Sequence, residues 1–333
     1  MTPSIDQLPI DIYYAIVECL SPINNRGTLY SLMFTSKKWF PAAERQFYHT
    51  FQYYDWKDPG NAQKGFLESI ALAPRRANYV RVATFHFDPA RLPASPTKIL
   101  KLMINLTLLE CWNVETPHAK TALNGCHFPL LTEFAFDAIG VETEMVAFLA
   151  AHPRLRKLTI YWSALFPVPP NILPDLDSLG GTFELFSQFC VGRAIKRLHR
   201  IPAFRPEVIE QITTNGPYKD VEVLAAGDCP EHLILQIPTL FPNLTKLFLG
   251  IIQDPEWVMS IFTQLPRLKR LALLAPSYVG LVLEPDILNV LKKHKTLTSV
   301  DITAGGDDGS FHRYVPNSVN PTFATFDEVY DSF

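Results

Sequence analysis

Apolar and polar positions alternate with a helical period in the first fifty residues. Ile12, Ile16 and Leu20 recur every four residues, a spacing that places side chains on one face of an α-helix. Ser21-Pro22 ends this segment, because the residue before a proline disfavours helical dihedral angles. Further helices are predicted from about residue 28 and about residue 41. Three helices this short bury too little surface to be stable alone, so they need a neighbouring domain or a partner.

A different pattern repeats along the chain after residue 75. Copies of Leu-x-x-apolar-x-apolar begin at Leu131, Leu155, Leu244, Leu268 and Leu297, with weaker copies before and between them. Short amphipathic segments separate the copies and predict helices. A period of about 20–29 residues around such a core is typical of a leucine-rich-repeat solenoid. We therefore expect an α/β fold with a curved parallel sheet, helices outside it, and strands in chain order centred near residues 85, 109, 134, 158, 198, 224, 247, 271 and 300.

Two regions depart from the repeat. Residues 164–190 contain two proline clusters and a Gly-Gly pair, which predict one distorted or inserted repeat. Residues 305–333 lose the periodicity, so we expect an irregular, poorly ordered tail. The predicted organisation is a helical module over 1–52, an irregular solenoid over 53–304 and this tail. The alternative fold is a conventional α/β sheet with right-handed crossovers, but the glycine-rich first turn of a doubly wound nucleotide-binding sheet is missing.

Composition limits the kinds of function. Hydrophobic residues make up 47% and charged residues 19% of the chain, so a sizeable core can form. The net charge of −3 gives no support to nucleic-acid binding, and we interpret the basic stretch at 192–200 as a solvated strand edge. Five scattered cysteines favour reduced thiols in the cytoplasm or nucleus. No secretory signal and no apolar run of about 18 residues occur, so no membrane span is expected.

Motifs for catalysis and metal binding do not occur in the sequence. It has no HExxH, no G-x-S-x-G and no Cys-x-x-Cys. Cys229 lies near His232 and acidic residues, an arrangement that could pair a nucleophile with a base. The pattern instead places Cys229 at the end of a strand, with Pro230 opening the next helix. We therefore expect no catalytic residue, no metal and no cofactor.

The segment from about residue 5 to residue 51 resembles the F-box. It has the family's elements in order, namely Leu8-Pro9, an apolar helix, Leu29-x-x-Leu32, Ser36-Lys37-Lys38-Trp39 and Phe47-Tyr48. With the repeats, the chain is similar to fungal-type F-box proteins that carry a C-terminal leucine-rich-repeat-like solenoid. An F-box docks on the Skp adaptor of cullin–RING ubiquitin ligases. The resemblance implies adaptor contacts by Leu8, Pro9, Ile12, Ile16, Leu20, Leu29, Leu32 and Trp39.

This resemblance implies a substrate-receptor subunit of a Skp–cullin–F-box ubiquitin ligase. Such a subunit has no catalytic residue; it raises the concentration of a protein substrate near a charged ubiquitin-conjugating enzyme. One alternative is a repeat-containing interaction scaffold with no ligase role. Another is that the first helices only cap the repeats, which burial of Leu8, Pro9, Ile12 and Trp39 against the repeats would favour.

Strand alternation predicts where a substrate would bind. Side chains beside the buried leucines point to the opposite, concave face of the sheet. Basic residues there suit an acidic or phosphorylated peptide, since Arg grips phosphate with two hydrogen bonds. The alternative is that these charges are solvated and only serve solubility. The predicted set is one column of Lys157, Arg197, Lys246 and Arg270, with Tyr161 and Phe248 nearby.

Overall fold

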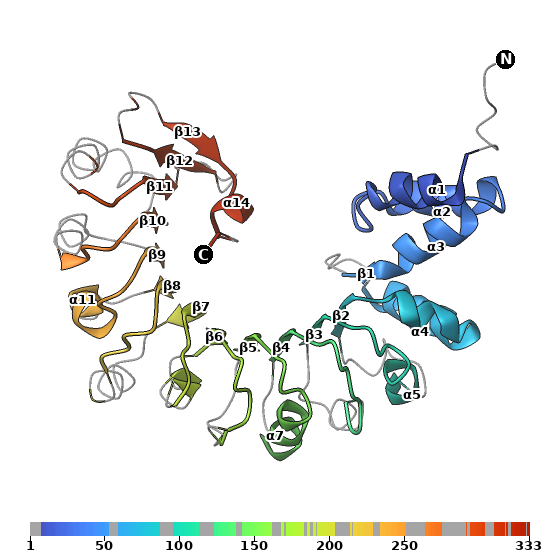
Figure 1. The fold of residues 1–333 in the computed structure, drawn as a ribbon, viewed down its shortest axis with the longest axis horizontal. Helices are drawn as coiled ribbons and strands as arrows, with labels where there is room; N and C mark the ends of the chain where they lie inside the picture. Colours follow the sequence, from blue (N-terminus) through green and yellow to red (C-terminus); the bar gives the residue numbers. More distant parts are fainter. Residues whose placement is uncertain are drawn as a thin grey trace. The chain divides into compact units, whose positions relative to one another are not determined.

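The computed structural model divides the chain into two compact units. The first contains the helical module and the first repeats, and the second contains the remaining repeats and the C-terminal segment (Figure 1). The residues that the structure describes are 8–52, 59–86, 96–112, 123–137, 142–161, 168–169, 171–182, 185–186, 189–190, 192–203, 214, 216–228, 234–250, 264–274, 291, 294–303, 310–316, 318, 321–330 and 332–333.

The first unit begins with three helices and continues into a parallel sheet. Strands β1 to β4 pair in chain order, and all their pairings are parallel. The elements are α1 (Ile10–Glu18), α2 (Arg26–Thr35), α3 (Phe40–His49), β1 (Thr50–Phe51), α4 (Pro59–Leu72), the 3-10 helix η2 (Pro74–Tyr79), β2 (Val82–His86), α5 (Pro96–Leu100), β3 (Leu108–Trp112), β4 (Glu133–Asp137) and α7 (Glu142–Ala150).

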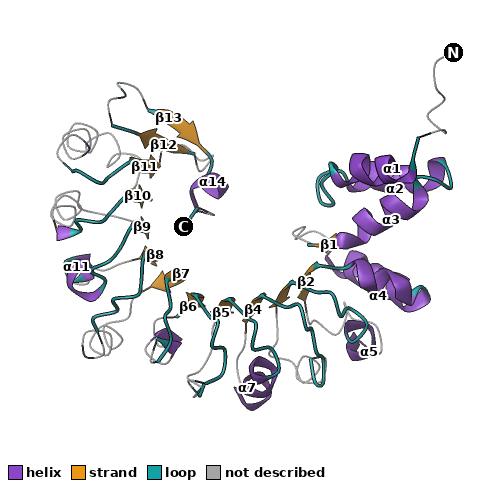
Figure 2. Ribbon diagram, viewed as in Figure 1, coloured by secondary structure: helices purple, strands orange, loops and turns teal. Residues whose placement is uncertain are grey.

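The second unit continues the repeat and ends differently. Strands β5 to β11 pair in parallel and in chain order, whereas β12 and β13 join antiparallel. Helix α11 and helix α14 lie on opposite sides of these strands (Figures 1 and 2). The elements are β5 (Lys157–Tyr161), β6 (Ser178–Gly181), β7 (Arg197–Ala203), β8 (Val223–Asp228), α11 (Ile237–Leu240), β9 (Lys246–Gly250), β10 (Arg270–Leu273), β11 (Ser299–Thr303), β12 (Phe311–Tyr314), β13 (Thr322–Ala324) and α14 (Phe326–Tyr330).

The predicted repeat strands are confirmed. Each predicted centre falls within an observed strand, and the order within each unit shows no reversal at which a nucleotide-binding switch point could form. The repeated apolar residues are buried; Leu155, Leu158 and Ile160 in one copy are all fully inaccessible to solvent. The fold class is therefore α/β with a mostly parallel open sheet.

The irregular region 164–190 contains one short strand, β6, which pairs in parallel with β5 and β7. Two residues there have left-handed backbone conformations, Leu173 at a φ of 60° and Gly181 at a φ of 131°. This agrees with the predicted distorted repeat. Most residues of the amphipathic segments at 206–214, 255–266 and 285–295, which predict helices between the strands, lie outside the described residues.

The prediction of an irregular tail is wrong for its described residues. They form β12, β13 and α14, which pack on the sheet through Phe311, Ala324, Val329 and Phe333. These side chains bury apolar surface, and β12 and β13 also extend the backbone hydrogen bonding of β11. The repeat period does not reveal this, because the segment follows a hairpin pattern instead.

Stability of the first unit should depend on pH through His152. His152 is buried; Phe128 N donates to its Nε2 at 2.9 Å, and its Nδ1 lies 2.7 Å from Phe148 O. This arrangement fits a neutral ring that donates from Nδ1. Burial lowers the pKa of His152 below 6.5, a hydrogen bond to Phe148 O partly opposes this, and the charge of His127 lowers it further. The folded state then binds fewer protons than the unfolded state at about pH 6. The free energy of unfolding should therefore be highest above pH 6.5 and fall as the pH is lowered.

The measurement is urea unfolding of the parent and of His152→Gln at about pH 7.5 and about pH 5.5. The variant should be less stable at pH 7.5 by about 1–3 kcal/mol, because buried backbone groups lose a partner. It should also lose less stability on acidification than the parent does. His49, whose pKa is also lowered chiefly by burial, provides a second variant for separating the two histidines. Equal acid sensitivity of the parent and His152→Gln would rule out this role.

Candidate functional site

The three N-terminal helices have a small core of their own. Helix α3 packs against both α1 and α2. Tyr13 and Trp39 meet edge to face, with ring centroids 4.6 Å apart, and Gln46 Nε2 donates to Leu20 O at 2.8 Å. The buried members of this core are Tyr13, Val17, Leu29 and Ala42, and partly buried side chains that pack against them are Leu8, Tyr14, Leu20, Leu32, Trp39 and Phe47.

Large apolar side chains remain exposed on α1 and α2. On α1, Ile10, Ile12 and Ile16 are 63%, 37% and 44% exposed. On α2, Tyr30 and Phe34 are 55% and 71% exposed, and their rings lie one helical turn apart with centroids separated by 4.9 Å. We call these five residues the exposed module set. Large apolar side chains grouped at a protein surface are typical of a protein-interaction site.

The predicted adaptor residues fall into three groups. Pro9, Ile12 and Ile16 are exposed, as an interaction surface requires. Leu8, Leu20, Leu32 and Trp39 are only partly exposed, because they also pack on the module's core. Leu29 is fully buried, so its prediction as a surface contact is wrong; its side chain fills the space between α2 and the other helices.

Sequence reasoning missed Ile10, Tyr30 and Phe34. The spacing of Tyr30 and Phe34, one helical turn apart, was the available signal. The F-box motif in α2 consists of Leu29 and Leu32, which pack on the module's core. The motif therefore indicated the buried side of α2 and not the side with Tyr30 and Phe34.

A second face of α3 joins the helical module to the first repeats. Tyr48 OH donates to Ser69 Oγ at 2.9 Å. Glu44 is 2% exposed, and its carboxylate accepts from Arg75 Nη2 at 3.1 Å and Arg76 Nε at 2.9 Å. The contact between the helical module and the first repeats is therefore made by α3 and η2 rather than by the exposed module set.

The strand register brings the predicted basic residues into one row of the second unit. Lys157 aligns with Ser178, Ser178 with Arg197, Arg197 with Val223, Val223 with Lys246, and Lys246 with Arg270. We call the side of the sheet that carries Lys157, Arg197, Lys246 and Arg270 the basic face. The predicted alignment is confirmed, and the role of these residues in binding stays a prediction.

Charge repulsion and burial both act on Lys246. Its pKa is lowered, first by burial and then by the positive charges of Arg270 and Arg197. An anionic group placed beside these three side chains would relieve that repulsion, because an opposite charge within about 4–6 Å favours the charged form. Arg197 and Arg270 already pair with Asp177 and Asp301, so the positive charge of the basic face is partly compensated.

The C-terminal segment covers part of the basic face. Phe248, predicted to be exposed, is 4% exposed because Tyr330 and Phe333 pack on its ring, with centroids 5.4 Å and 6.0 Å away. Lys246 Nζ donates to Ser332 O at 2.7 Å. The prediction of an exposed Phe248 is therefore wrong. The side chain of Tyr161 lies outside the described residues.

Two arginines converge on one buried carboxylate at the covered end of the basic face. Asp301 is 0% exposed; Arg270 Nε donates to its Oδ2 at 2.9 Å, and Arg313 Nε from β12 donates to its Oδ1. Arg270 also lies over the Phe333 ring, 5.2 Å from its centroid. Its Nη2 is buried and has no hydrogen-bond partner in the described part of the structure. The two N–H donors of Arg270 Nη2 thus have no acceptor among the described residues.

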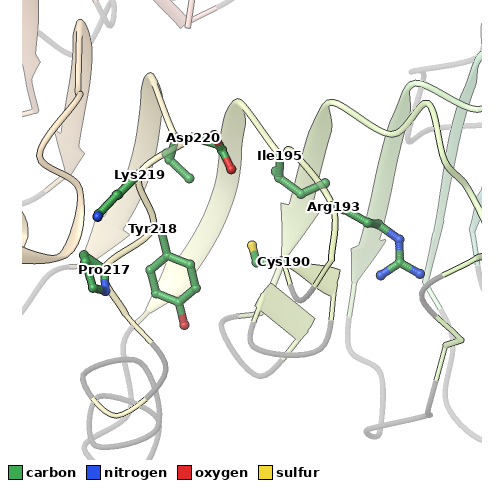
Figure 3. Close-up of a pocket in the computed structure, with 8 residues that line it drawn as sticks. Cys190, Arg193, Ile195, Pro217, Tyr218, Lys219 and Asp220 are labelled. Carbon is green, nitrogen blue, oxygen red and sulfur yellow. The ribbon is translucent and has the colours of Figure 1, made fainter.

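A cavity of about 310 Å³ lies between the segments that precede β7 and β8 (Figure 3). Cys190 and Tyr218 both line it. Burial raises the pKa of the Cys190 thiol to about 12 and that of the Tyr218 phenol to about 12. Both groups are neutral at physiological pH, so Cys190 lacks the thiolate character of a catalytic nucleophile. Cys229 and His232 lie outside the described residues.

The described parts of the chain bring no three His, Cys, Asp or Glu side chains together in an arrangement that could hold a metal ion. Every helix in these parts is too short or too polar to traverse a bilayer.

Comparison with known proteins finds similarity among solved structures, and one such structure is weakly similar. No protein-family model and no curated protein matches the chain. A chain in the solved structure titled "Structure of the Toll - Spatzle complex, a molecular hub in Drosophila development and innate immunity" is similar, with a TM-score of 0.33 and 12% sequence identity. The similarity covers 65% of this chain and 33% of that one. This chain therefore spans about a third of the length of its structural neighbour.

Proposed function

We propose that this protein is the substrate-receptor subunit of a Skp–cullin–F-box ubiquitin ligase. Helices α1 to α3 would bind the Skp adaptor as an F-box, and the repeats would bind a protein substrate. The chain would supply no chemistry of its own. Its contribution would be to hold the substrate close to a charged ubiquitin-conjugating enzyme, which raises the effective concentration of the reacting groups.

The exposed module set is the observation that carries this proposal. The module already has a core, yet it leaves Ile12, Ile16 and Phe34 in contact with water. Covering such side chains with a partner removes apolar surface from water, which favours association. The F-box resemblance of the same helices identifies the Skp adaptor as the partner to test.

The structural-cap alternative is less well supported. It requires Leu8, Pro9, Ile12 and Trp39 to be buried against the repeats. Pro9 and Ile12 are exposed, while Leu8 and Trp39 pack within the module itself. An interaction scaffold without a ligase role also accounts for the exposed side chains, and adaptor binding separates it from the proposal.

Ile12→Asp combined with Ile16→Asp should weaken adaptor binding by at least about 30-fold. That factor corresponds to about 2 kcal/mol, the loss typical of a central interface contact. Both side chains are exposed, so the module should keep its helix content. The measurement is calorimetric titration of the full chain with purified Skp adaptor.

Leu72→Asp is the matched control for this substitution. Leu72 is 86% exposed on α4, in the same unit and outside the module. Its replacement should leave adaptor affinity within about twofold of the parent. Equal affinity of the double variant and the Leu72→Asp control would exclude the exposed isoleucines from the adaptor interface.

A further inference from the structure

The C-terminal segment packs on the basic face through described aromatic and aliphatic side chains. Tyr330 and Phe333 pack on Phe248, and Val329 is fully buried in the same cluster. Lys246 Nζ donates to Ser332 O, and the β13 part of the segment pairs with β12. We call residues 322–333 the cover. The described contacts of the part after β13 resemble those of a short peptide bound by two aromatic anchors and one backbone carbonyl.

The surface beneath the cover is suited to aromatic side chains. Ala225, Phe248 and Ala272 are aligned in one row across β8, β9 and β10. The ring of Phe248 therefore stands between two small side chains, which leave space for rings that pack against it. Offset or edge-to-face aromatic pairs add about 0.5–1.5 kcal/mol beyond the burial of their surface.

The basic face extends past the cover and retains unused capacity for anions. Arg197 is 52% exposed, and its ion pair with Asp177 is long, at 3.5 Å. Arg270 Nη2 has no described hydrogen-bond partner beneath the Phe333 ring. A ligand with more than one carboxylate or phosphate near its aromatic anchors could pair with both arginines. The cover itself has this composition, because its sequence TFATFDEVYDSF mixes aromatic and acidic residues.

We propose that the cover is a removable internal ligand, and that the basic face beneath it binds acidic peptides with aromatic anchors. A partner peptide would displace the cover, place its rings on Phe248 and give separate anionic groups to Arg270 and Arg197. This inference rests on the part of the proposed function that assigns partner binding to the repeats. It does not involve the Skp adaptor.

The test uses the full chain and a fluorescent peptide with the sequence of residues 322–333. Tyr330→Ala combined with Phe333→Ala removes the two anchors of the cover, so the face is open more often. Apparent affinity is reduced by the fraction of molecules in the competent state. The double variant should therefore bind the peptide at least about tenfold more tightly than the parent, as measured by fluorescence anisotropy.

Two matched comparisons locate the binding. In the double variant, the further change Lys246→Ala should weaken peptide binding about tenfold or more, because the charge and the carbonyl contact are both lost. Lys269→Ala, at an exposed position next to Arg270, should leave the peptide affinity of the double variant unchanged. A peptide with both aromatic residues at positions 330 and 333 replaced by Ala should not bind. Equal peptide affinity of the parent and a folded double variant would overturn the proposal.

Hydrogen exchange of the parent decides the question if the double variant does not fold. A removable cover opens without unfolding the sheet, so amides of α14 should exchange at least about 100-fold faster than those of β9 and β10. Equal protection of the α14 and β9 amides from hydrogen exchange would show that the cover is a permanent part of the core. That result would contradict the proposal. Both measurements omit the adaptor, so a failure here leaves the adaptor experiment unaffected.

Discussion

Asp301→Ala should lower the free energy of unfolding by about 3–5 kcal/mol, the cost of removing one partner from a buried ion pair. Asp301 is fully buried and receives hydrogen bonds from Arg270 and Arg313. Without the carboxylate, two guanidinium groups would face each other with little water to screen them. Because Arg313 belongs to β12 and Arg270 to β10, the loss should also loosen the C-terminal hairpin. Chemical denaturation of the full chain measures the effect.

Asp177→Ala is the matched control for Asp301→Ala. Asp177 also pairs with an arginine, but the two side chains are 38% and 52% exposed and 3.5 Å apart. Exposed pairs of this kind contribute about 0–1 kcal/mol, so the control should be nearly as stable as the parent. A loss below about 1 kcal/mol for Asp301→Ala would mean that water or movement of β12 compensates the arginines.

Gly181→Ala should destabilise the second unit by at least about 3 kcal/mol, because a strained backbone angle alone costs about 1–3 kcal/mol and a clash is added. Gly181 has a φ of 131°, and a Cβ there would lie 2.2 Å from Ile160 O on the neighbouring strand. That oxygen belongs to the backbone of β5, so it cannot move aside without disturbing the sheet. Denaturation measured by far-UV circular dichroism checks the loss.

Gly65→Ala is the control for backbone effects of the substitution. Gly65 lies in helix α4, and a Cβ there would meet nothing within 4 Å. Alanine is favoured over glycine in a helix by about 1 kcal/mol, so this variant should be slightly more stable than the parent. Equal stability of the Gly181→Ala and Gly65→Ala proteins would show that β6 adjusts freely around position 181.

The repeat strands could be predicted from sequence because each one carries the same local signal. The apolar residues at Leu155, Leu158 and Ile160 mark an inward face, and strand alternation then assigns their neighbours to the other face. Since parallel pairing keeps the repeats in register, the row from Lys157 to Arg270 followed as well.

Helical periodicity was less informative about the N-terminal module. Ile12 and Ile16 fit an apolar stripe, yet Tyr13 and Val17 are the residues of α1 that face the core. Apolar residues on two adjacent strips of one helix satisfy the same period, and only packing decides which strip is buried. The ion pairs of Glu44 likewise depend on residues about thirty positions away, which no local pattern records.

The cover could not be predicted because its contacts are long-range. Lys246 and Ser332 are 86 positions apart in the sequence, and the local sequence around either residue does not indicate that the two are in contact. The loss of the repeat period made residues 305–333 look irregular. Their aromatic residues have a structural role only once β8 to β11 present Phe248 and its small neighbours.

Direct titration of the purified Skp adaptor into the full-length chain tests the central proposal most directly. The F-box interpretation predicts a one-to-one complex with a Kd below about 1 μM, equivalent to about −8 kcal/mol of binding free energy. The exposed module set should become protected from hydrogen exchange in that complex, whereas α14 should not change. No binding heat and separate elution of the two proteins at micromolar concentration would contradict the proposal and favour a scaffold without a ligase role.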